Sequence, residues 1–455
     1  MTNKCFTLSN RWIIRHDPFL HKKYFAYNID NAEKYYLNIT SYVILSIFEY
    51  NYLSCDNIFC FIRDKNICIT FQEVEKIVEK LFSIGFLSDI RPEYSAEFNR
   101  INPFEKVNAK ISLASSPYEV EIHFTKECNL LCKHCFYSAG NKFNNQLNKN
   151  DWIRFFEDLE ENKILRLIIS GGEPLLFPEV KSLLNDLAQR KIRIDLLTNG
   201  TLIDNDIAKI ISARNFSTSI SIDGVDDETH NFLRGKKCFS DVTRSIEMLA
   251  ERRVFFQIST TLHKKNYIQI DKLIEWSIQK KANSINFILI DPMGRAAKHK
   301  NLLLDKIDVE SIVDMINSAK KKYKHCIEIG FLDPSKPQYQ FFDIDDKGDE
   351  LIYCTAGTAR IAVRSDGNVF PCTYGFEDDF FCIGNIRNDN IFSLWRKENL
   401  NLFRGDITLS QLPICANCEI ADNCTLKVCR LRAYYKHGDF FGVPPGCYQA
   451  DFLNK

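Results

Sequence analysis

The sequence lacks an excess of charge of either sign. Its 59 Lys and Arg residues balance 59 Asp and Glu residues, so the formal net charge is zero. A neutral chain has no overall field that attracts nucleic acid or an anionic membrane surface. We therefore expect neither a nucleic-acid partner nor a membrane-surface partner.

Long apolar runs are also missing. The longest, such as "YVILSIF", are far shorter than the roughly 20 residues that span a bilayer. The N-terminus "MTNKCFTLSN" has no basic region followed by an apolar core. The chain shows no low-complexity tract and no repeat of fixed period. We expect a cytoplasmic protein without membrane contact, and its 455 residues allow about two to four domains.

Cysteine, by contrast, is abundant. The chain has 17 cysteines, an odd number, and ten of them fall in close spacings. Disulfides are rare in the reducing cytosol, so iron–sulfur or zinc ligation is the better interpretation of these ten. Scattered cysteines are expected to be small buried hydrophobes: Cys5, Cys55, Cys60, Cys68, Cys238 and Cys326.

Residues 1–90 are predicted to form a winged helix-turn-helix. "KYYLNI" is strand-like, and Thr40 or Ser41 is expected to cap the apolar helix that follows. A second helix begins in "TFQEVEKIVEKLFSIGFL" and stops near Gly85. The sequence places Phe71, Val74, Val78 and Leu81 on one face of this helix. Residues 91–117 lack periodicity and are predicted to be a linker.

Residues 118–300 alternate between strand-like and helix-like segments. The strand-like runs are "EVEIHF", "LRLIIS", "RIDLLT", "STSISI", "VFFQIST" and "SINFIL". Six such repeats predict an α/β fold with a parallel sheet, open or closed into a partial (β/α)6 barrel. Residues 301–350 are predicted to be a bridging helix and a polar linker. Residues 351–455 form a cysteine-rich C-terminal domain in this interpretation.

Three cysteines follow the first of these strands with C-x3-C-x2-C spacing: Cys128, Cys132 and Cys135. Active sites of such folds lie at the C-terminal ends of the strands. Three thiolates can hold a [4Fe–4S] cluster and leave one iron open to a substrate or cofactor. The alternative is a structural zinc knuckle with a distant fourth ligand.

Short motifs follow the other strands in order. They are "SGGEPLL", "TNG", "SIDG", then "RG", "TTLHKKN" and "DPMGRA". Alone, each could be an ordinary turn. Together with the cysteine triad, however, they make residues 118–300 resemble the radical S-adenosylmethionine (SAM) enzymes. The resemblance implies that SAM chelates the open iron and yields a 5′-deoxyadenosyl radical that abstracts a substrate hydrogen.

The resemblance also implies which residues contact SAM. Gly171, Gly172 and Glu173 would meet the methionyl amine, and Ser221 and Arg234 would hold the ribose and the carboxylate. The remaining expected cofactor-binding residues are Thr198, Asn199 and Asn266. His134 is expected either to flank the adenine or to be an exposed loop histidine.

Seven more cysteines in the C-terminal region resemble the SPASM domain, which carries two auxiliary [4Fe–4S] clusters. The resemblance assigns Cys354, Cys372 and Cys429 to an inner cluster, and Cys415, Cys418, Cys424 and Cys447 to an outer one. Cys382 would be a fourth inner ligand or a buried strand residue. Four residues, "TLKV", precede Cys429, where the family usually has three. A zinc ribbon is the alternative for the run of four cysteines alone.

The N-terminal region is similar to the peptide-recognition element of ribosomal-peptide maturases, which binds a precursor's leader as an added β-strand. The alternative is a DNA-binding domain, but the predicted recognition helix is not basic. The whole chain resembles the sactisynthases. That resemblance implies three [4Fe–4S] clusters, a flavodoxin or ferredoxin reductant and formation of thioethers in a leader-bearing precursor peptide.

Other radical chemistries stay open at this point. The same scaffold could form carbon–carbon or carbon–oxygen crosslinks. An anaerobic sulfatase-maturing enzyme, which makes formylglycine, is similar in its core and C-terminus. That group typically has an aspartate immediately after the second inner-cluster cysteine, where this chain has Thr373. A non-catalytic iron–sulfur protein is the last alternative, and the cysteine triad with "GGEP" argues against it.

Overall fold

The computed structural model describes residues 4–17, 23–49, 53–64, 69–89, 114–331, 351–419, 421, 424, 426–445 and 447. Cys68, most of the predicted linker 91–117 and the polar stretch 332–350 lie outside them. The chain divides into two compact units, with Met1–Asn108, Ser112–Ser115 and Asp343–Asp345 in the first and the rest in the second. Within the described ranges, no helix has the length and apolar character needed to cross a membrane.

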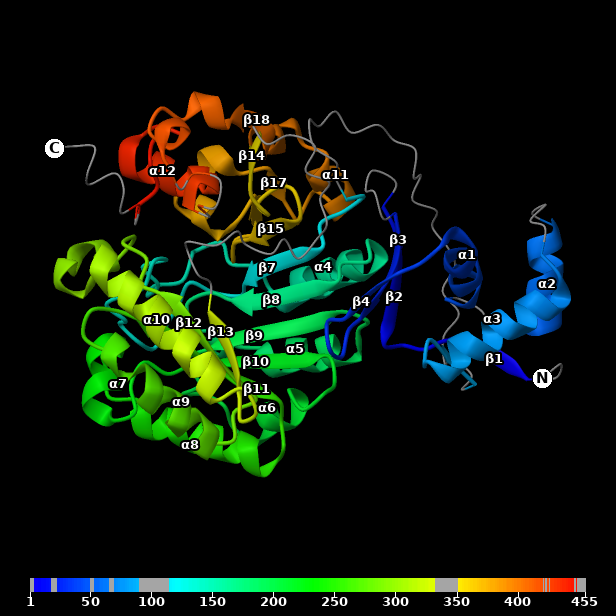
Figure 1. Ribbon diagram of the computed structural model, residues 1–455, viewed down its shortest axis with the longest axis horizontal. Helices are drawn as coiled ribbons and strands as arrows, with labels where there is room; N and C mark the ends of the chain where they lie inside the picture. The colour runs from blue at the N-terminus through cyan, green and yellow to red at the C-terminus, as the bar shows by residue number, and fades with distance from the viewer. Residues whose placement is uncertain are drawn as a thin grey trace. The chain divides into compact units, whose positions relative to one another are not determined.

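In its described residues, the first unit combines two small antiparallel sheets with three helices (Figure 1). One sheet has the order β5-β1-β6 and the other β2-β3-β4. The strands are β1 (Cys5–Leu8), β2 (Trp12–His16), β3 (Tyr24–Asn28), β4 (Lys34–Tyr36), β5 (Leu53–Ser54) and β6 (Leu87–Ser88). The helices are α1 (Ile39–Phe48), α2 (Cys55–Asp64) and α3 (Phe71–Ser83).

Helix α3 agrees closely with its prediction. Thr70 and Glu73 form a capping box at its start, and Val74, Val78 and Leu81 are buried. Gly85 follows its end with φ +78°, a conformation that favours glycine.

The predicted cap of α1 is wrong. Asn38 fills that role, since its Oδ1 accepts from the Ser41 amide at 2.8 Å. Strands β1, β2 and β3 and helix α2 were not predicted, and the winged helix-turn-helix as a whole stays a prediction.

The second unit is built on one ten-stranded sheet of order β13-β12-β11-β10-β9-β8-β7-β15-β16-β17. The strands from β13 to β15 are parallel to their neighbours, and β16 and β17 are antiparallel. The six predicted strands are β7 (Glu119–His123), β8 (Arg166–Ser170), β9 (Arg193–Thr198), β10 (Phe216–Ser221), β11 (Phe256–Leu262) and β12 (Ser284–Leu289).

The sheet has more strands than the six that were predicted. The alternation continues through α10 (Lys306–Lys322) into β13 (Glu328–Phe331), which pairs in parallel with β12. At the other edge β15 (Arg360–Val363) pairs with β7, so the C-terminal region extends the sheet itself. The remaining strands are β14 (Leu351–Tyr353), β16 (Asn368–Phe370), β17 (Gly384–Asn385) and β18 (Arg404–Thr408).

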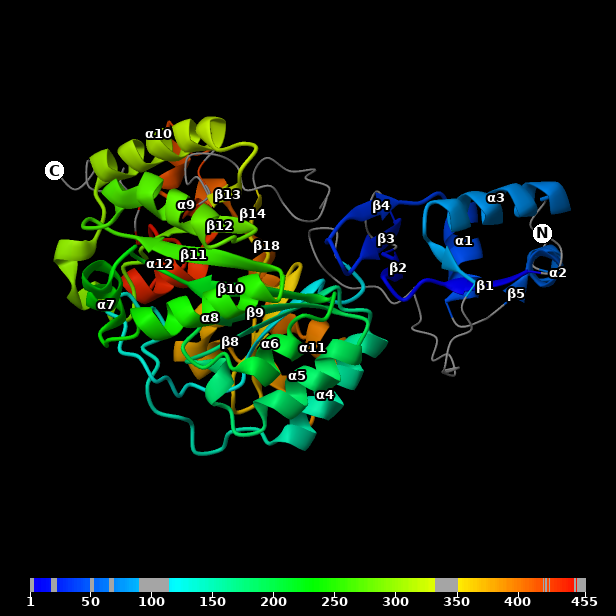
Figure 2. The ribbon, with the colours of Figure 1, turned by 90° about the horizontal axis from the view of Figure 1, so that it is seen from below.

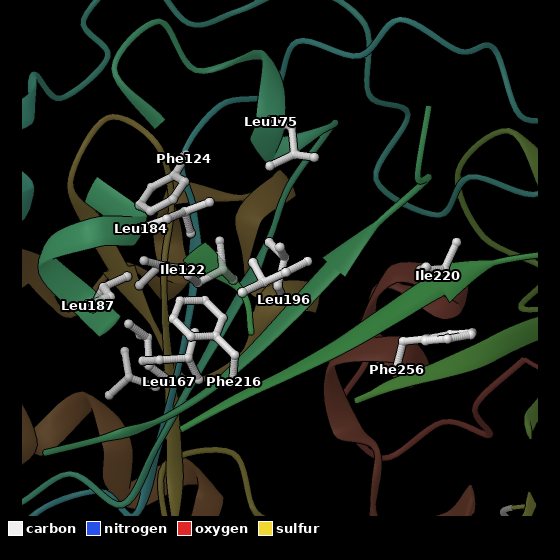
Figure 3. Close-up of a cluster of buried hydrophobic side chains, with 14 of the residues drawn as sticks. Ile122, Phe124, Leu167, Leu175, Leu184, Leu187, Leu196, Phe216, Ile220 and Phe256 are labelled. Atoms are coloured by element: carbon white, nitrogen blue, oxygen red, sulfur yellow. The ribbon is translucent and has the colours of Figure 1, made fainter. Parts of the chain in front are cut away.

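Helices cover the parallel strands and share one apolar core with them (Figure 2). They are α4 (Lys149–Glu161), α5 (Val180–Gln189), α6 (Asn205–Ile210), α8 (Phe239–Glu251), α9 (Ile270–Gln279) and α10. Helix α7 (Asp227–Arg234) contributes Leu233 to a separate small apolar cluster. Figure 3 shows Leu184 and Leu187 of α5 meeting Ile122 and Leu167 of the strands. The C-terminal region adds α11 (Ile391–Trp395) and α12 (Arg430–His437).

The scattered cysteines follow their prediction only in part. Cys55 and Cys238 are buried, and Cys5 is half-buried. Cys60 and Cys326 are exposed, so the prediction is wrong for them. Cysteine's tendency to be buried is a statistical preference, and neither residue lies on an apolar face that would enforce it.

Candidate active site at the strand ends

The cysteine triad lies in the loop that follows β7. Cys132 is buried, while Cys128 and Cys135 are half-buried. All three pack in one small apolar cluster with Leu130 and Cys238. The structure thus brings the triad together at the C-terminal edge of the sheet, as predicted for a reactive centre.

The Arg295 side chain holds this loop through hydrogen bonds to its carbonyl groups. Its Nε donates to the Cys132 carbonyl at 2.8 Å, and its Nη1 donates to the Ala139 carbonyl at 2.6 Å. The preceding Gly294 has φ +56°, and a Cβ there would lie 2.2 Å from the Phe136 carbonyl oxygen. The motif "DPMGRA" therefore fixes the cysteine loop.

Gly171 and Gly172 follow β8 and approach the same loop closely. A Cβ on Gly172 would lie 2.0 Å from the Glu127 carbonyl oxygen, and one on Gly171 would lie 2.5 Å from that of Thr125. The Gly172 amide donates to the Thr125 carbonyl at 2.9 Å. Only glycine fits this contact between two backbones.

Glu173 is fully buried and its carboxylate is bound by protein groups. It accepts from the Leu175 amide at 3.1 Å, the Thr198 hydroxyl at 2.7 Å and the Asn199 amide at 2.8 Å. Burial raises the pKa of Glu173 to about 7, although these bonds oppose the rise. The first role of Glu173 in this structure is to hold the "TNG" turn.

The "TNG" turn is hydrogen-bonded to the cysteine loop. Asn199 Nδ2 donates to Asn129 Oδ1 at 2.8 Å, and Asn129 Nδ2 donates to Thr201 Oγ1 at 2.8 Å. Asn129 was not among the predicted site residues. The sequence feature that could have pointed to Asn129 is its position between Cys128 and Cys132. Its hydrogen-bond partners, however, are 70 or more residues away in the sequence.

Arg234 also lies beside the cysteine triad. Its Nη1 is 3.8 Å from Cys132 Sγ, and its Nε is 2.6 Å from a carboxylate oxygen of Asp223. Burial alone would raise the pKa of Asp223, but the guanidinium outweighs it and the pKa lies below its usual value. Ser221, two residues earlier, ends β10 and is half-buried.

Asn266 uses its amide within the protein. Its Nδ2 donates to the carbonyls of Asp223 and Thr261, each at 3.0 Å, and its Oδ1 accepts from the His263 amide at 2.7 Å. This polar group shapes the rim around Asp223.

His134 is not the exposed loop histidine of one prediction. Burial, with Arg234 nearby, lowers its pKa to about 3, so the ring is neutral. Its Nδ1 is buried and has no hydrogen-bond partner. An unpaired buried nitrogen can accept or donate a bond to a ligand.

The C-terminal cysteines form two groups. Burial, with the nearby Cys429 thiol, raises the pKa of Cys354 to about 12. Burial also raises the pKa of Cys372 well above its usual value, and Cys354 and Cys429 act in the same direction. Cys354 and Cys372 also pack in one apolar cluster.

The second group contains Cys415, Cys418, Cys424 and Cys447. Burial raises the pKa of the Cys415 thiol, the Arg430 guanidinium opposes this, and the thiols of Cys447, Cys424 and Cys418 add to it. The interleaved assignment of ligands stays a prediction, and the grouping of the thiols is compatible with it.

Cys382 packs in the same apolar cluster as Cys354 and Cys372, but no other thiol is among the groups that shift its pKa. Its thiol donates to the Gly384 carbonyl at 3.3 Å, and the charges that act on it are those of Asp379 and Arg364. This contact favours the interpretation as a strand-side residue.

Arg430 is buried near both groups. Its Nη1 donates to the carbonyls of Phe440 at 2.7 Å and Gly442 at 3.0 Å. Burial lowers its pKa, while Cys415 of the outer group and Cys429 and Cys354 of the inner group raise it. A buried cation between two sets of thiols favours anionic groups on both sides.

In the part of the chain that the structure describes, no three or more His, Cys, Asp or Glu side chains are arranged to hold a single metal ion. The donor chemistry fits iron–sulfur clusters, in which each thiolate binds a different iron. Cys132 beside Arg234, and the two C-terminal groups beside Arg430, supply the thiolates and the balancing cations.

A cavity of about 750 Å³ adjoins these groups within the second unit. Phe136 comes from the cysteine loop, Met293 from the segment after β12, and Arg432, Tyr435 and Cys447 from the C-terminal region. Its other lining residues include Ile290, Leu303, Leu304, Lys306, Glu377 and Lys436. The cavity is mostly apolar with a few charged groups, as ligand sites commonly are.

A network of polar side chains extends from Arg432, one of the residues that line this cavity. Arg432 Nη2 donates to Asp291 at 2.9 Å, and the Tyr374 hydroxyl donates to the other oxygen of Asp291. Asp291 follows β12, whereas Tyr374 follows Cys372. The network therefore joins the barrel edge to the inner cysteine group.

Comparison with known proteins gives two domain matches. Residues 122–277 match the Radical SAM superfamily, and residues 354–419 match SPASM, an iron–sulfur cluster-binding domain. An AdoMet-dependent heme synthase of Methanosarcina barkeri is 29% identical over 352 residues, which are 74% of this chain and 98% of the relative. The subtilosin biosynthesis protein AlbA of Bacillus subtilis is 22% identical over 61% of this chain and 59% of its own.

The fold as a whole has a solved counterpart. The crystal structure of Streptococcus suis SuiB bound to the precursor peptide SuiA matches with a TM-score of 0.75 at 18% identity. The match covers 98% of this chain and 100% of that one. At this identity the likeness is one of fold. The cysteine triad, the strand-end motifs and the domain matches agree: residues 122–277 form a radical SAM domain, and residues 354–419 form a SPASM iron–sulfur domain.

Proposed function

We propose that the protein is a radical SAM oxidoreductase that matures a ribosomally synthesised peptide by forming thioethers between cysteine sulfur and carbon. The observation that carries the proposal is the fold match over 98% of the chain to SuiB, which was solved with its precursor peptide. AlbA, by its name a bacteriocin biosynthesis protein, supports the same class. The product would be a sactipeptide-type crosslink.

In this proposal the triad holds the SAM cluster, and the two C-terminal groups hold inner and outer auxiliary [4Fe–4S] clusters. When bound, these groups supply a deoxyadenosyl radical and an electron acceptor, so that one C–H and one S–H bond are lost for each C–S bond formed. We take the inner set to be three cysteines, Cys354, Cys372 and Cys429, because the Cys382 thiol donates to the Gly384 carbonyl. Such a set leaves one iron for the substrate thiolate.

The hydrogen bonds of Glu173 support a change in the expected SAM contacts. Glu173 gives both carboxylate oxygens to protein donors. We therefore assign the methionyl amine to the main chain of Gly171 and Gly172, with Glu173, Thr198 and Asn199 holding that segment. We assign the carboxylate of SAM to Arg234, and Asn266 supports Arg234 through its hydrogen bond to Asp223.

The cavity is the proposed site of the modified part of the peptide. Phe136 and Met293 offer apolar surface, and the buried Tyr435 hydroxyl has no hydrogen-bond partner. A phenol in this state can bond a peptide carbonyl. The first unit is the proposed binding domain for the leader, which would add a strand to one of its sheets. A flavodoxin or ferredoxin is the proposed reductant.

One alternative has specific support. Carbon–carbon or carbon–oxygen crosslinking would use the same groups, and no contact among the described residues favours it over thioether formation. Tetrapyrrole chemistry is favoured by the 29% identity to the heme synthase, but that match leaves about a quarter of the chain uncovered. Formylglycine formation is less supported, because Thr373 provides no carboxylate next to Cys372.

The proposal is tested by deoxyadenosine formation in the anaerobically reconstituted full chain with SAM and a reductant. We expect a cysteine-bearing peptide encoded beside the gene to accelerate it and a porphyrin to have no effect. Acceleration by the porphyrin alone would overturn the peptide assignment.

A further inference from the structure

Asp223 is a buried carboxylate that no motif role accounts for. It follows β10 in "SIDG" and is fully buried. Its ion pair with Arg234, at 2.6 Å, is also buried. A buried carboxylate is expensive unless paired and hydrogen-bonded, so its retention calls for a reason.

Three segments of the rim converge on Asp223. Its Oδ1 accepts from the Thr261 amide at 2.9 Å, and its carbonyl accepts from Asn266 Nδ2 at 3.0 Å. Its amide donates to His230 Nδ1 at 3.2 Å. Asp223 is therefore fixed by β11, by the segment that follows it and by α7, and it can hold a partner in one place.

The partner is held against the cysteine loop. Arg234 Nη1 lies 3.8 Å from Cys132 Sγ, and the Arg234 carbonyl accepts from the Leu131 amide at 3.2 Å. The neighbouring Leu233 carbonyl accepts from the Lys133 amide at 2.8 Å. The end of α7 thus carries the guanidinium and grips the loop of the triad at the same time.

We infer that Asp223 is a positioning residue, which orients the Arg234 guanidinium beside Cys132 and thereby sets the affinity for SAM. The inference rests on the proposed binding of SAM at the triad. A guanidinium presents a rigid fork, so fixing one edge with a carboxylate aims the other edge. Residues that orient a binding group in this way typically change affinity 10–100-fold when altered.

Asp195 provides a matched control. It is also buried and pairs with Arg166 and Arg193, the latter at 3.5 Å, in the same sheet. Arg166 also bonds Glu119, so this pair serves other strands and not the cysteine loop. Asp195→Asn removes a comparable buried charge without touching the proposed site.

The experiment uses the anaerobically reconstituted full chain. Equilibrium SAM affinity, iron content and thermal midpoint are measured for the wild type, Asp223→Asn, Asp195→Asn, Arg234→Gln and the Asp223→Asn/Arg234→Gln double variant. We expect Asp223→Asn to weaken SAM binding about 10–100-fold with iron content retained. Asp195→Asn should lower only the thermal midpoint.

The double variant separates positioning from general destabilisation. If Asp223 acts through Arg234, Asp223→Asn adds no further loss of SAM affinity in the Arg234→Gln background. Additive losses, or unchanged affinity in Asp223→Asn, would overturn the inference. If Asp223→Asn fails to fold, Arg234→Lys replaces it in the test. A lysine cannot contact both Asp223 and Cys132, so this variant should weaken SAM binding similarly. Unchanged SAM affinity in Arg234→Lys would overturn the inference. A wild-type chain that holds iron but binds no SAM would overturn the proposed function itself.

Discussion

The parallel sheet carries a network of buried ion pairs at each end, and the two networks differ in what they face. At the N-terminal ends of the strands, Glu119 bonds Arg166 at 3.1 Å and Arg360 at 2.6 Å, and Asp195 pairs with Arg166. At the C-terminal ends, Asp223 holds Arg234 against Cys132.

The N-terminal network is closed on itself. Its carboxylates and guanidiniums neutralise one another and join β7, β8, β9 and β15. In the C-terminal network one edge of the guanidinium is directed at a thiol. Charge at the N-terminal end of such a sheet therefore stabilises it, whereas charge at the C-terminal end is available for chemistry. The following changes should separate the two ends.

The largest effect is expected at the C-terminal end. Replacing Cys128, Cys132 and Cys135 together with Ala removes the proposed cluster ligands, so deoxyadenosine formation should fall by more than about 10³-fold. Cys238→Ala is the control, since this thiol packs in the same apolar cluster. Deoxyadenosine from the triple variant, measured by liquid chromatography, would refute the assignment of the triad.

Gly172→Ala should come next. Its Cβ would lie 2.0 Å from the Glu127 carbonyl oxygen and 2.5 Å from that of Lys126, and backbone atoms cannot yield by that much. We expect SAM affinity to fall about 100-fold or more, as for other losses of site geometry. Gly140→Ala, in the same loop but with open space around its Cβ, should bind normally. Equal affinities would show that this contact is not needed.

Glu119→Gln should act on stability instead of binding. Removing one partner of a buried pair costs several kcal/mol, and the partial exposure of both arginines reduces this to about 2–4 kcal/mol. The free energy of unfolding should fall by this amount while SAM affinity is unchanged. A loss of SAM affinity without a loss of stability would contradict the division of roles.

The pH dependence should have opposite signs at the two ends. Burial is outweighed at Glu119 by Arg360 and Arg166, so its pKa lies below the usual value, whereas burial raises the pKa of Glu173 to about 7. The contribution of Glu119 is present above an unfolded pKa of about 4.3 and is lost as the pH falls through the folded value. That of Glu173 is present below about 4.3 and is lost as the pH rises through about 7.

Thermal midpoints from pH 3 to 9 test this. Relative to the wild type, Glu119→Gln should be least damaging in acid. Glu173→Gln should be least damaging at alkaline pH. Parallel curves for the two variants would show that the two carboxylates are equivalent.

The smallest effect is expected for Cys382→Ala. Since its thiol bonds the Gly384 carbonyl, iron content should stay near the wild-type value of about 12 per chain expected for three [4Fe–4S] clusters. Cys372→Ala is the comparison and should lose about four irons. A matching loss in Cys382→Ala, measured by iron assay after reconstitution, would make it the fourth inner ligand.

The sequence predicted the elements whose signal is local. The bounds of β9 and β12 agree with the predicted runs, because alternating apolar runs bounded by helices are distinctive. Strands β13 and β15 were missed because they are short and join the sheet over long distances. Arg360, for instance, bonds Glu119 from 241 residues away.

The same distinction holds for the site. Cysteine spacing and glycine pairs are local signals, and the triad and Gly172 were both predicted from them. Asp223 and Asn129 were not, since their importance lies in partners that only the folded chain brings near. Glu173 was predicted as a cofactor ligand. In the folded chain its carboxylate accepts hydrogen bonds from Thr198 and Asn199, and this supporting role could not be predicted from the sequence.

The most direct test of the account is the intact mass and fragmentation of a cysteine-bearing precursor peptide encoded beside the gene and co-expressed anaerobically with this protein. The account predicts a loss of about two hydrogens per crosslinked cysteine, with those thiols blocked to alkylation, because each C–S bond replaces one C–H and one S–H bond. The same loss with every thiol free would place the link between other atoms. An unchanged peptide beside robust deoxyadenosine formation would contradict the proposed substrate.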